Sequence, residues 1–132
     1  MRAQVEVRQF IERRPKARSP YGNKFMMLSQ RGVEELSERL ADRTLGLQAL
    51  RVLFAMMQSL DWENRVQCSQ KDLGLSLGMS SQEVSKASRL LAECGFIERI
   101  ENRRGWYRVS PRLCWRGSVK NLEAALRDRE AA

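Results

Sequence analysis

The 132-residue sequence contains no histidine, so the most versatile metal ligand and general base of proteins is missing. The three cysteines, Cys68, Cys94 and Cys114, are an odd number, lie far apart and form no Cys-x-x-Cys pair. Neither a disulfide framework nor a common zinc site is expected, and this cysteine usage fits a reducing compartment. We therefore expect no metal and no cofactor.

Long apolar runs are lacking as well. No run approaches the ~20 residues of a membrane span, and residues 1–18 are polar and charged, unlike a signal peptide. The sequence also has no glycine-rich phosphate loop, no paired-carboxylate signature and no imidazole beside a cysteine. We expect a bacterial cytoplasmic protein that is not an enzyme and has no membrane partner.

Acidic side chains are scarce relative to basic ones, at 16 against 24, which gives a net charge of +8. Residues 1–24 carry seven basic and two acidic side chains, and residues 69–117 carry nine and five. Residues 25–68 have a net charge of −1, and residues 118–132 are neutral. The positive charge therefore gathers in two segments, a distribution typical of proteins that bind polyanions such as nucleic acids.

Residues 73–95 have the pattern of two short helices around a tight turn. Ser69 can cap a first helix, Gln70–Leu77, in a variant of the capping box that uses Asp72 in place of glutamate. Gly78 and Met79 would form the bend. Gly74 lies where a close helix contact needs a small residue, whereas Leu75 is predicted to face solvent.

The second helix is expected to begin at Ser80 or Ser81 and to end near Cys94, because Gly95 is a typical C-terminal stop. Its inward face would hold Val84, Ala87, Leu90, Leu91 and Cys94. Its outer face would hold Ser81, Gln82, Glu83, Ser85, Lys86 and Arg89. This arrangement predicts a helix-turn-helix with a polar, basic outer face.

A β-hairpin is expected next, from strands at Phe96–Ile100 and Trp106–Val109 with Asn102-Arg103-Arg104-Gly105 at its tip. Arg65–Cys68 would add a third strand. A helix-turn-helix followed by such a hairpin is a winged helix. The predicted fold class is therefore mainly α with a small β-sheet, a winged helix-turn-helix with flanking N- and C-terminal helices.

The remaining segments flank this module. We expect a basic arm at 1–24, the winged helix-turn-helix domain at 25–117 and a C-terminal helix at 118–132. Before the helix-turn-helix we expect a short helix face with Val5, Val7, Phe10 and Ile11 and an extended segment at Lys24–Leu28. Two helices follow: one from Gln30 to about Leu40, capped by Ser29 with a stripe of Val33, Leu36 and Leu40, and one at Leu45–Leu60, capped by Thr44. After the hairpin we expect a loop at Pro111–Gly117 and a helix from Ser118 to about Arg129. The Leu45–Leu60 helix is apolar almost all round, which predicts a central position in the core or against a partner subunit, or else an adaptable methionine surface.

The geometry of a winged helix assigns roles to the exposed residues. Gln82 suits adenine, Lys86 and Arg89 suit guanine or phosphate, and helix N-termini at Ser69 and Ser80 suit phosphate oxygens. The predicted DNA-contacting residues are Ser69, Lys71, Ser80, Ser81, Gln82, Ser85, Lys86, Arg89, Asn102, Arg103 and Arg104. The basic residues of the arm, Arg13, Arg14, Lys16 and Arg18, either touch phosphate or belong to a solvated tail.

The segment from Val52 to Gly117 resembles the winged-helix plasmid replication proteins of the RepL type, within the MarR-like group. The resemblance is carried by Asn64-Arg65-Val66, Leu77-Gly78-Met79-Ser80, Val84-Ser85-Lys86, Gly95-Phe96-Ile97 and above all Tyr107–Gly117, which is similar to the ending Y-x-[IV]-N-P-x-x-[FW]-x-G. Ser110 stands where asparagine is usual. The resemblance implies a plasmid or other mobile-element origin and a role at a replication or promoter locus.

These observations predict a homodimer that binds double-stranded DNA sequence-specifically and regulates transcription or replication at its own locus by occupying a palindromic or repeated site. Contact with replication or transcription machinery is a further expectation. Two alternatives stay open: a MarR-like ligand-responsive repressor, which needs a cavity near the Leu45–Leu60 helix, and a winged-helix adaptor that binds protein.

Overall fold

The computed structural model describes residues 20–131, and the side chains of residues 20–129 within that range. Its elements, in chain order, are β1 (Met27–Leu28), α2 (Gln30–Ala41), α3 (Leu47–Gln58), the short 3₁₀ helix η1 (Trp62–Asn64), β2 (Arg65–Gln67), α4 (Gln70–Leu77), α5 (Ser81–Glu93), β3 (Ile97–Arg99), β4 (Trp106–Val109), β5 (Cys114–Trp115) and α6 (Val119–Ala131). The predicted fold class, mainly α with a small antiparallel sheet, is confirmed.

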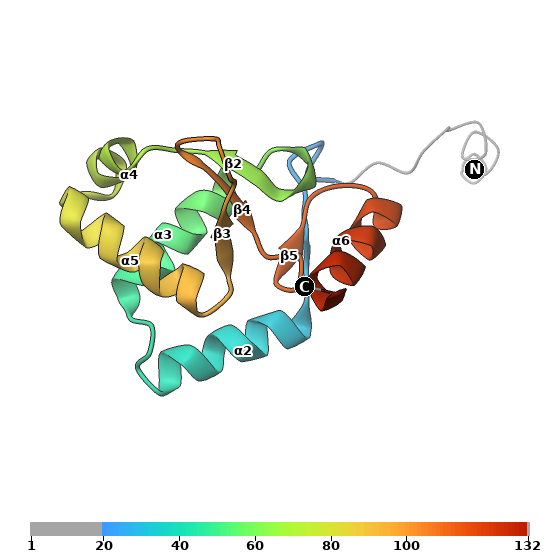
Figure 1. Cartoon of the computed structure of the whole chain (residues 1–132), viewed down its shortest axis with the longest axis horizontal. Helices are drawn as coiled ribbons and strands as arrows, with labels where there is room; N and C mark the ends of the chain where they lie inside the picture. The colour runs from blue at the N-terminus through green and yellow to red at the C-terminus, as the bar shows by residue number, and fades with distance from the viewer. Residues whose placement is uncertain (1–19, 132) are drawn as a thin grey trace, which may run out of the picture.

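Three antiparallel strands in the order β2-β4-β3 lie at the centre of the molecule (Figure 1). Tyr107 of β4 is paired with Val66 of β2 and with Arg99 of β3, so the predicted third strand is confirmed. Helices α4 and α5 lie on one side of this sheet and α6 on the opposite side, while α2 runs beneath it in the view of Figure 1.

A second, two-stranded sheet joins β1 to β5, with Met27 opposite Trp115. The sequence predicted only a loop at Pro111–Gly117, and this was wrong for Cys114–Trp115. A two-residue strand is too short to show an alternating pattern, and its pairing partner lies far away in the sequence. The extended segment expected at Lys24–Leu28 does contain β1.

Helix α3 occupies the centre of the core, where Val52, Leu53 and Met56 are fully buried. The predicted central position of this helix in the core is therefore confirmed, although Leu47 is 70% and Phe54 54% exposed. These two residues are seven positions apart and therefore share one outward face.

The start of α3 also differs from the prediction. The helix begins after Gly46 rather than after Thr44. The Thr44 backbone N–H and hydroxyl both donate to Oδ1 of Asp42, at 2.9 Å and 2.6 Å. Thr44 thus completes the turn after α2, and these bonds hold the Asp42 carboxyl pKa below its ordinary value. Ser29 caps α2 as predicted, but Val33 of the predicted α2 stripe is exposed.

Asn64 fastens the sheets together from a fully buried position. Its Nδ2 donates to the Val109 carbonyl at 2.9 Å and to the Cys114 carbonyl at 2.7 Å, and its Oδ1 accepts the Arg116 N–H at 2.7 Å. One side chain therefore joins Asn64-Arg65-Val66 to Tyr107–Gly117, two segments of the resemblance above that lie about fifty residues apart in the sequence.

Ser110 holds the turn that follows β4. Its Oγ accepts the Arg112 backbone N–H at 3.2 Å, and its own N–H donates to the Phe96 carbonyl at 2.8 Å. A serine hydroxyl can form the same type of local turn as an asparagine side chain, so the substitution in the resembling motif is accommodated.

Helix α6 packs on the body of the molecule. Trp115 Nε1 donates to the Ser118 carbonyl at 3.0 Å, Asn121 donates to Glu63, and Arg129 pairs with Glu98 at 3.7 Å. Leu122 and Leu126 of the predicted stripe are half-buried, whereas Val119 is exposed, so the stripe is covered only in part.

Candidate nucleic-acid interface

Helix α4 is set up by its cap and by one close contact. Ser69 Oγ accepts the Asp72 N–H at 3.0 Å, but among the described residues Asp72 returns no bond, because its carboxylate is one methylene shorter than that of glutamate. A Cβ at Gly74 would lie 2.6 Å from the Met79 carbonyl oxygen. The prediction of a close contact at Gly74 is confirmed, and α4 can approach the turn only because this residue has no side chain.

Helix α5 begins with a complete capping box. Ser80 Oγ accepts the Glu83 N–H at 3.1 Å, and Glu83 Oε1 accepts the Ser80 N–H at 2.8 Å. These bonds, led by the one from the Ser80 backbone, lower the pKa of the Glu83 carboxyl below its ordinary value. Glu83 thus has a structural role at the start of the helix.

The outer face of α5 carries Gln82, Lys86 and Arg89 at positions i, i+4 and i+7, and all three are exposed. Ser81 is exposed and Ser85 half-buried on the neighbouring stripe. The inward residues expected from the sequence are buried or half-buried. The predicted division of this helix into a core face and a polar, basic face is therefore confirmed.

The hairpin β3–β4 is attached to the start of α4. The Cys68 N–H donates to the Gly105 carbonyl at 2.8 Å, and Gly105 has a φ of +80° that favours glycine. At the tip, Arg103 and Arg104 are exposed, and the Arg103 guanidinium lies 5.4 Å from the centroid of the Trp106 ring. This contact holds the Arg103 side chain over the hairpin.

The charges on this end of the molecule are available for a partner. The three ion pairs among the described residues join Arg39 to Asp42, Arg112 to Glu35 and Arg129 to Glu98, all outside the α4–α5 face and the hairpin tip. Within residues 20–131, none of the cations on α4, α5 and the β3–β4 hairpin is in an ion pair, namely Lys71, Lys86, Arg89, Arg99, Arg103, Arg104 and Arg108.

Two hollows lie between the helices and the β3–β4 hairpin. One of about 900 Å³ lies between the first turn of α4 and the hairpin tip. The other, of about 260 Å³, lies between α5 and β3. Gln70, Arg99 and Tyr107 line both. These three residues were not among the predicted site residues. Arg99 lies two positions after the buried Ile97 on β3, and this spacing places both side chains on the same, helix-facing side of the sheet.

The structure brings the predicted residues of the helix-turn-helix and the hairpin to one end of the molecule, on α4, α5 and the β3–β4 connection (Figure 1). Leu75 is 76% exposed there, as expected. The predicted arm residues and the predicted helix near residues 5–11 lie outside the described residues. Among residues 20–131 we find no group of side chains suited to hold a metal ion and no helix long and apolar enough to cross a membrane.

Two of the three cysteines, Cys68 and Cys114, have thiols whose pKa is raised above the ordinary value. Burial raises the pKa of the Cys114 thiol to about 12. The pKa of the Cys68 thiol is also raised, mainly by burial and to a smaller extent by the nearby Asp72 carboxylate. Both thiols are therefore protonated at neutral pH, because a thiolate forms only when the pH approaches the pKa.

The order of α4, turn, α5 and hairpin, with a third strand from β2, defines a winged helix-turn-helix protein. The family model described as Firmicute plasmid replication protein (RepL) matches residues 39–129 of this chain. The protein belongs to the RepL family. The match runs from the end of α2 into α6 and so includes the whole candidate interface. Searches of curated proteins and of solved structures returned no significant match.

Proposed function

We propose that this protein binds duplex DNA sequence-specifically through α5 and the β3–β4 hairpin. The observation that carries the proposal is the row of exposed, unpaired polar and basic side chains on α5, which continues to the arginines of the hairpin tip. An α-helix fits the major groove, where the first turns meet base edges. The hairpin tip would then reach the neighbouring minor groove or its phosphates.

The proposed biological role follows from the RepL family. The protein would act in the bacterial cytoplasm, without catalysis of its own, at a locus of the plasmid that encodes it. Occupation of a palindromic or repeated site by a homodimer would mark an origin for replication or block a promoter. Contacts with replication or transcription machinery would follow from that position.

The direct test is the double change Lys86→Ala with Arg89→Ala, compared with Lys120→Ala with Arg127→Ala on α6. Both doubles remove two exposed positive charges, but only the first lies on the proposed reading face. The α5 double should lose roughly 1–3 kcal/mol per base contact on its selected site, and the α6 double much less. Fluorescence anisotropy with a duplex selected from a random pool measures both.

Arg103→Ala separates phosphate contact from base reading. It should weaken binding to all duplexes alike and reduce the slope of log K against log salt by roughly one phosphate contact. If the α5 double binds the selected duplex as well as the unchanged protein does, the reading face is wrong. Preserved function in that case favours the protein-binding adaptor.

A ligand-responsive repressor is the second candidate, because a hollow of about 490 Å³ lies beside the C-terminal end of α3. Phe25 and Met57 supply apolar walls, and Arg116 supplies a charge. Under this alternative a small molecule bound there would change DNA affinity. Phe25→Ala should then alter the ligand response without changing the DNA sequence preference.

A further inference from the structure

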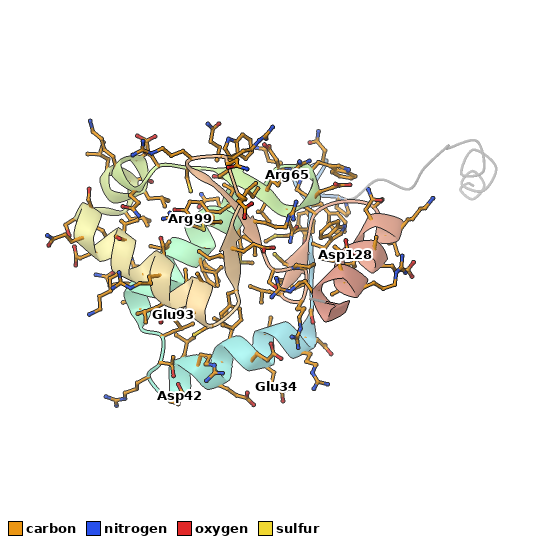
Figure 2. All side chains as sticks on the ribbon, viewed as in Figure 1. Glu34, Asp42, Arg65, Glu93, Arg99 and Asp128 are labelled. Carbon is orange, nitrogen blue, oxygen red and sulfur yellow. The ribbon has the colours of Figure 1, made fainter. Side chains whose placement is uncertain are left out.

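The hollow between α5 and β3 is lined by eight residues, six of which have polar or charged side chains. Its polar wall is formed by Gln70, Ser85, Ser88, Arg89, Arg99 and Tyr107. Figure 2 labels Arg99 between α5 and the strands of the hairpin. The wall combines residues from α4, α5 and the sheet, so the hollow exists only in the folded protein.

Ser88 is the unexpected member of this wall. It is only 6% exposed, and its Oγ has no hydrogen-bond partner among the described residues. Buried hydroxyl groups in native proteins almost always have a partner. A serine within a helix can also bond to the carbonyl four residues earlier, and this one does not. The Ser88 hydroxyl therefore lacks an internal partner at a position that lines the hollow.

The charges of the wall favour an anion. Arg89 and Arg99 both line the hollow, neither forms an ion pair within residues 20–131, and no carboxylate is among the lining residues. A guanidinium group matches the geometry of phosphate oxygens and can donate two bonds to them. A serine hydroxyl adds a neutral donor of the kind often found at phosphate sites.

The position of the hollow adds a further argument. It shares Gln70, Arg99 and Tyr107 with the larger hollow at the hairpin tip, which Arg103 and Arg104 also line. The two hollows are therefore neighbours, one beside α5 and the other at the hairpin tip. A phosphodiester backbone that follows these neighbouring hollows would place a phosphate beside Ser88.

We propose that the Ser88 hydroxyl, with Arg89 and Arg99, binds one phosphate group in this hollow. The phosphate comes either from the backbone of bound DNA, in which case the inference rests on the proposed function, or from free phosphate. Both sources present the same oxygens to the same donors, and the experiment below separates them.

The first arm measures binding of the full chain to a short mixed-sequence duplex as a function of salt. Ser88→Ala should weaken binding about tenfold, because a hydrogen bond to a charged acceptor is lost. The salt slope should not change, since the serine is neutral. Ser37→Ala, an exposed serine on α2, is the matched control and should bind normally.

Arg99→Gln should reduce the salt slope by about one, which corresponds to one lost phosphate contact. Arg31→Gln on α2 is its control and should leave the slope unchanged. Thermal unfolding accompanies both arms. Ser88→Ala should unfold no earlier than the unchanged protein, because the replaced hydroxyl has no internal bond to lose.

The second arm titrates inorganic phosphate into the free protein and follows the amide NMR signals of Ser88 and Arg99. Saturable shifts that Ser88→Ala abolishes, with unchanged duplex binding, support the site with free phosphate as its source. They do so even if the protein binds no DNA. Weaker duplex binding by Ser88→Ala supports the backbone as the source. If Ser88→Ala changes neither binding reaction, the proposal is overturned.

Discussion

At the scale of single residues, Asn64 shows how much one buried polar side chain can hold together. It bonds to β4, β5 and Arg116, and it does so from a left-handed backbone conformation with a φ of +64°. Asparagine tolerates that conformation better than most residues. The position therefore demands both the amide and the backbone tolerance of this residue type.

Asn64→Ala should lower the free energy of unfolding by about 3 kcal/mol or more, because two buried carbonyls and one N–H lose their partner. Asn102→Ala is a matched control, since Asn102 also has a positive φ, +63°, but is exposed at the hairpin tip. It should cost only ~1 kcal/mol of backbone strain. Urea denaturation measures both, and equal losses would show that the Asn64 bonds contribute nothing.

At the scale of elements, the angle between α4 and α5 depends on Gly74. A methyl group there would meet the Met79 carbonyl at 2.6 Å, and because that atom is backbone the turn itself would have to move. The orientation of α5 relative to the hairpin follows from this packing. The same contact therefore serves both stability and the geometry of the candidate interface.

Gly74→Ala should destabilise the fold by about 1–3 kcal/mol despite the better helix propensity of alanine, because the site is overpacked. Duplex binding should fall even at temperatures where the variant is folded. Gly46→Ala, where a Cβ would meet nothing within 4 Å, should cost about 0.5 kcal/mol or less and bind normally. A Gly74→Ala protein with unchanged stability and affinity would contradict the close-contact argument.

The elements with strong local signals were the ones that the sequence predicted well. Helix α4 was predicted with both of its ends, because Ser69 caps it and Gly78, with a φ of +67°, ends it. Helix α5 was predicted with its faces, because its apolar spacing is regular. Strand β5 has no local signal. Thr44 was predicted to cap the next helix, but its hydroxyl donates to the Asp42 carboxylate instead.

The contrast between local and non-local signals also explains which parts of the candidate site could be predicted from the sequence. Exposed residues of α5 and the hairpin tip follow from helix periodicity and from the position of the turn. The hollow beneath them could not be predicted, because Ser88, Arg99 and Gln70 come together only through the packing of three elements. Neither burial of the Ser88 hydroxyl nor its missing partner can be read from neighbouring residues in the chain.

At the scale of the whole molecule, α4 and α5, which carry unpaired cations, lie at one end and α6 lies at the other (Figure 1). One such subunit presents a single α5 to the DNA. If two subunits are related by a two-fold axis, as the proposed homodimer requires, the two copies of α5 face the same side of the duplex. Their half-sites would then be about one helical turn apart.

This symmetry makes binding sensitive to the phase of the two half-sites. Insertion of about five base pairs between them turns one half-site to the opposite side of the duplex, and a rigid dimer should then lose most of its affinity. Insertion of about ten base pairs restores the phase and should recover part of it. Anisotropy titrations on the three duplexes, with the mass in solution measured by sedimentation, make the comparison. Equal affinity for all three would mean that the subunits bind independently, because only a fixed two-fold arrangement couples affinity to helical phase.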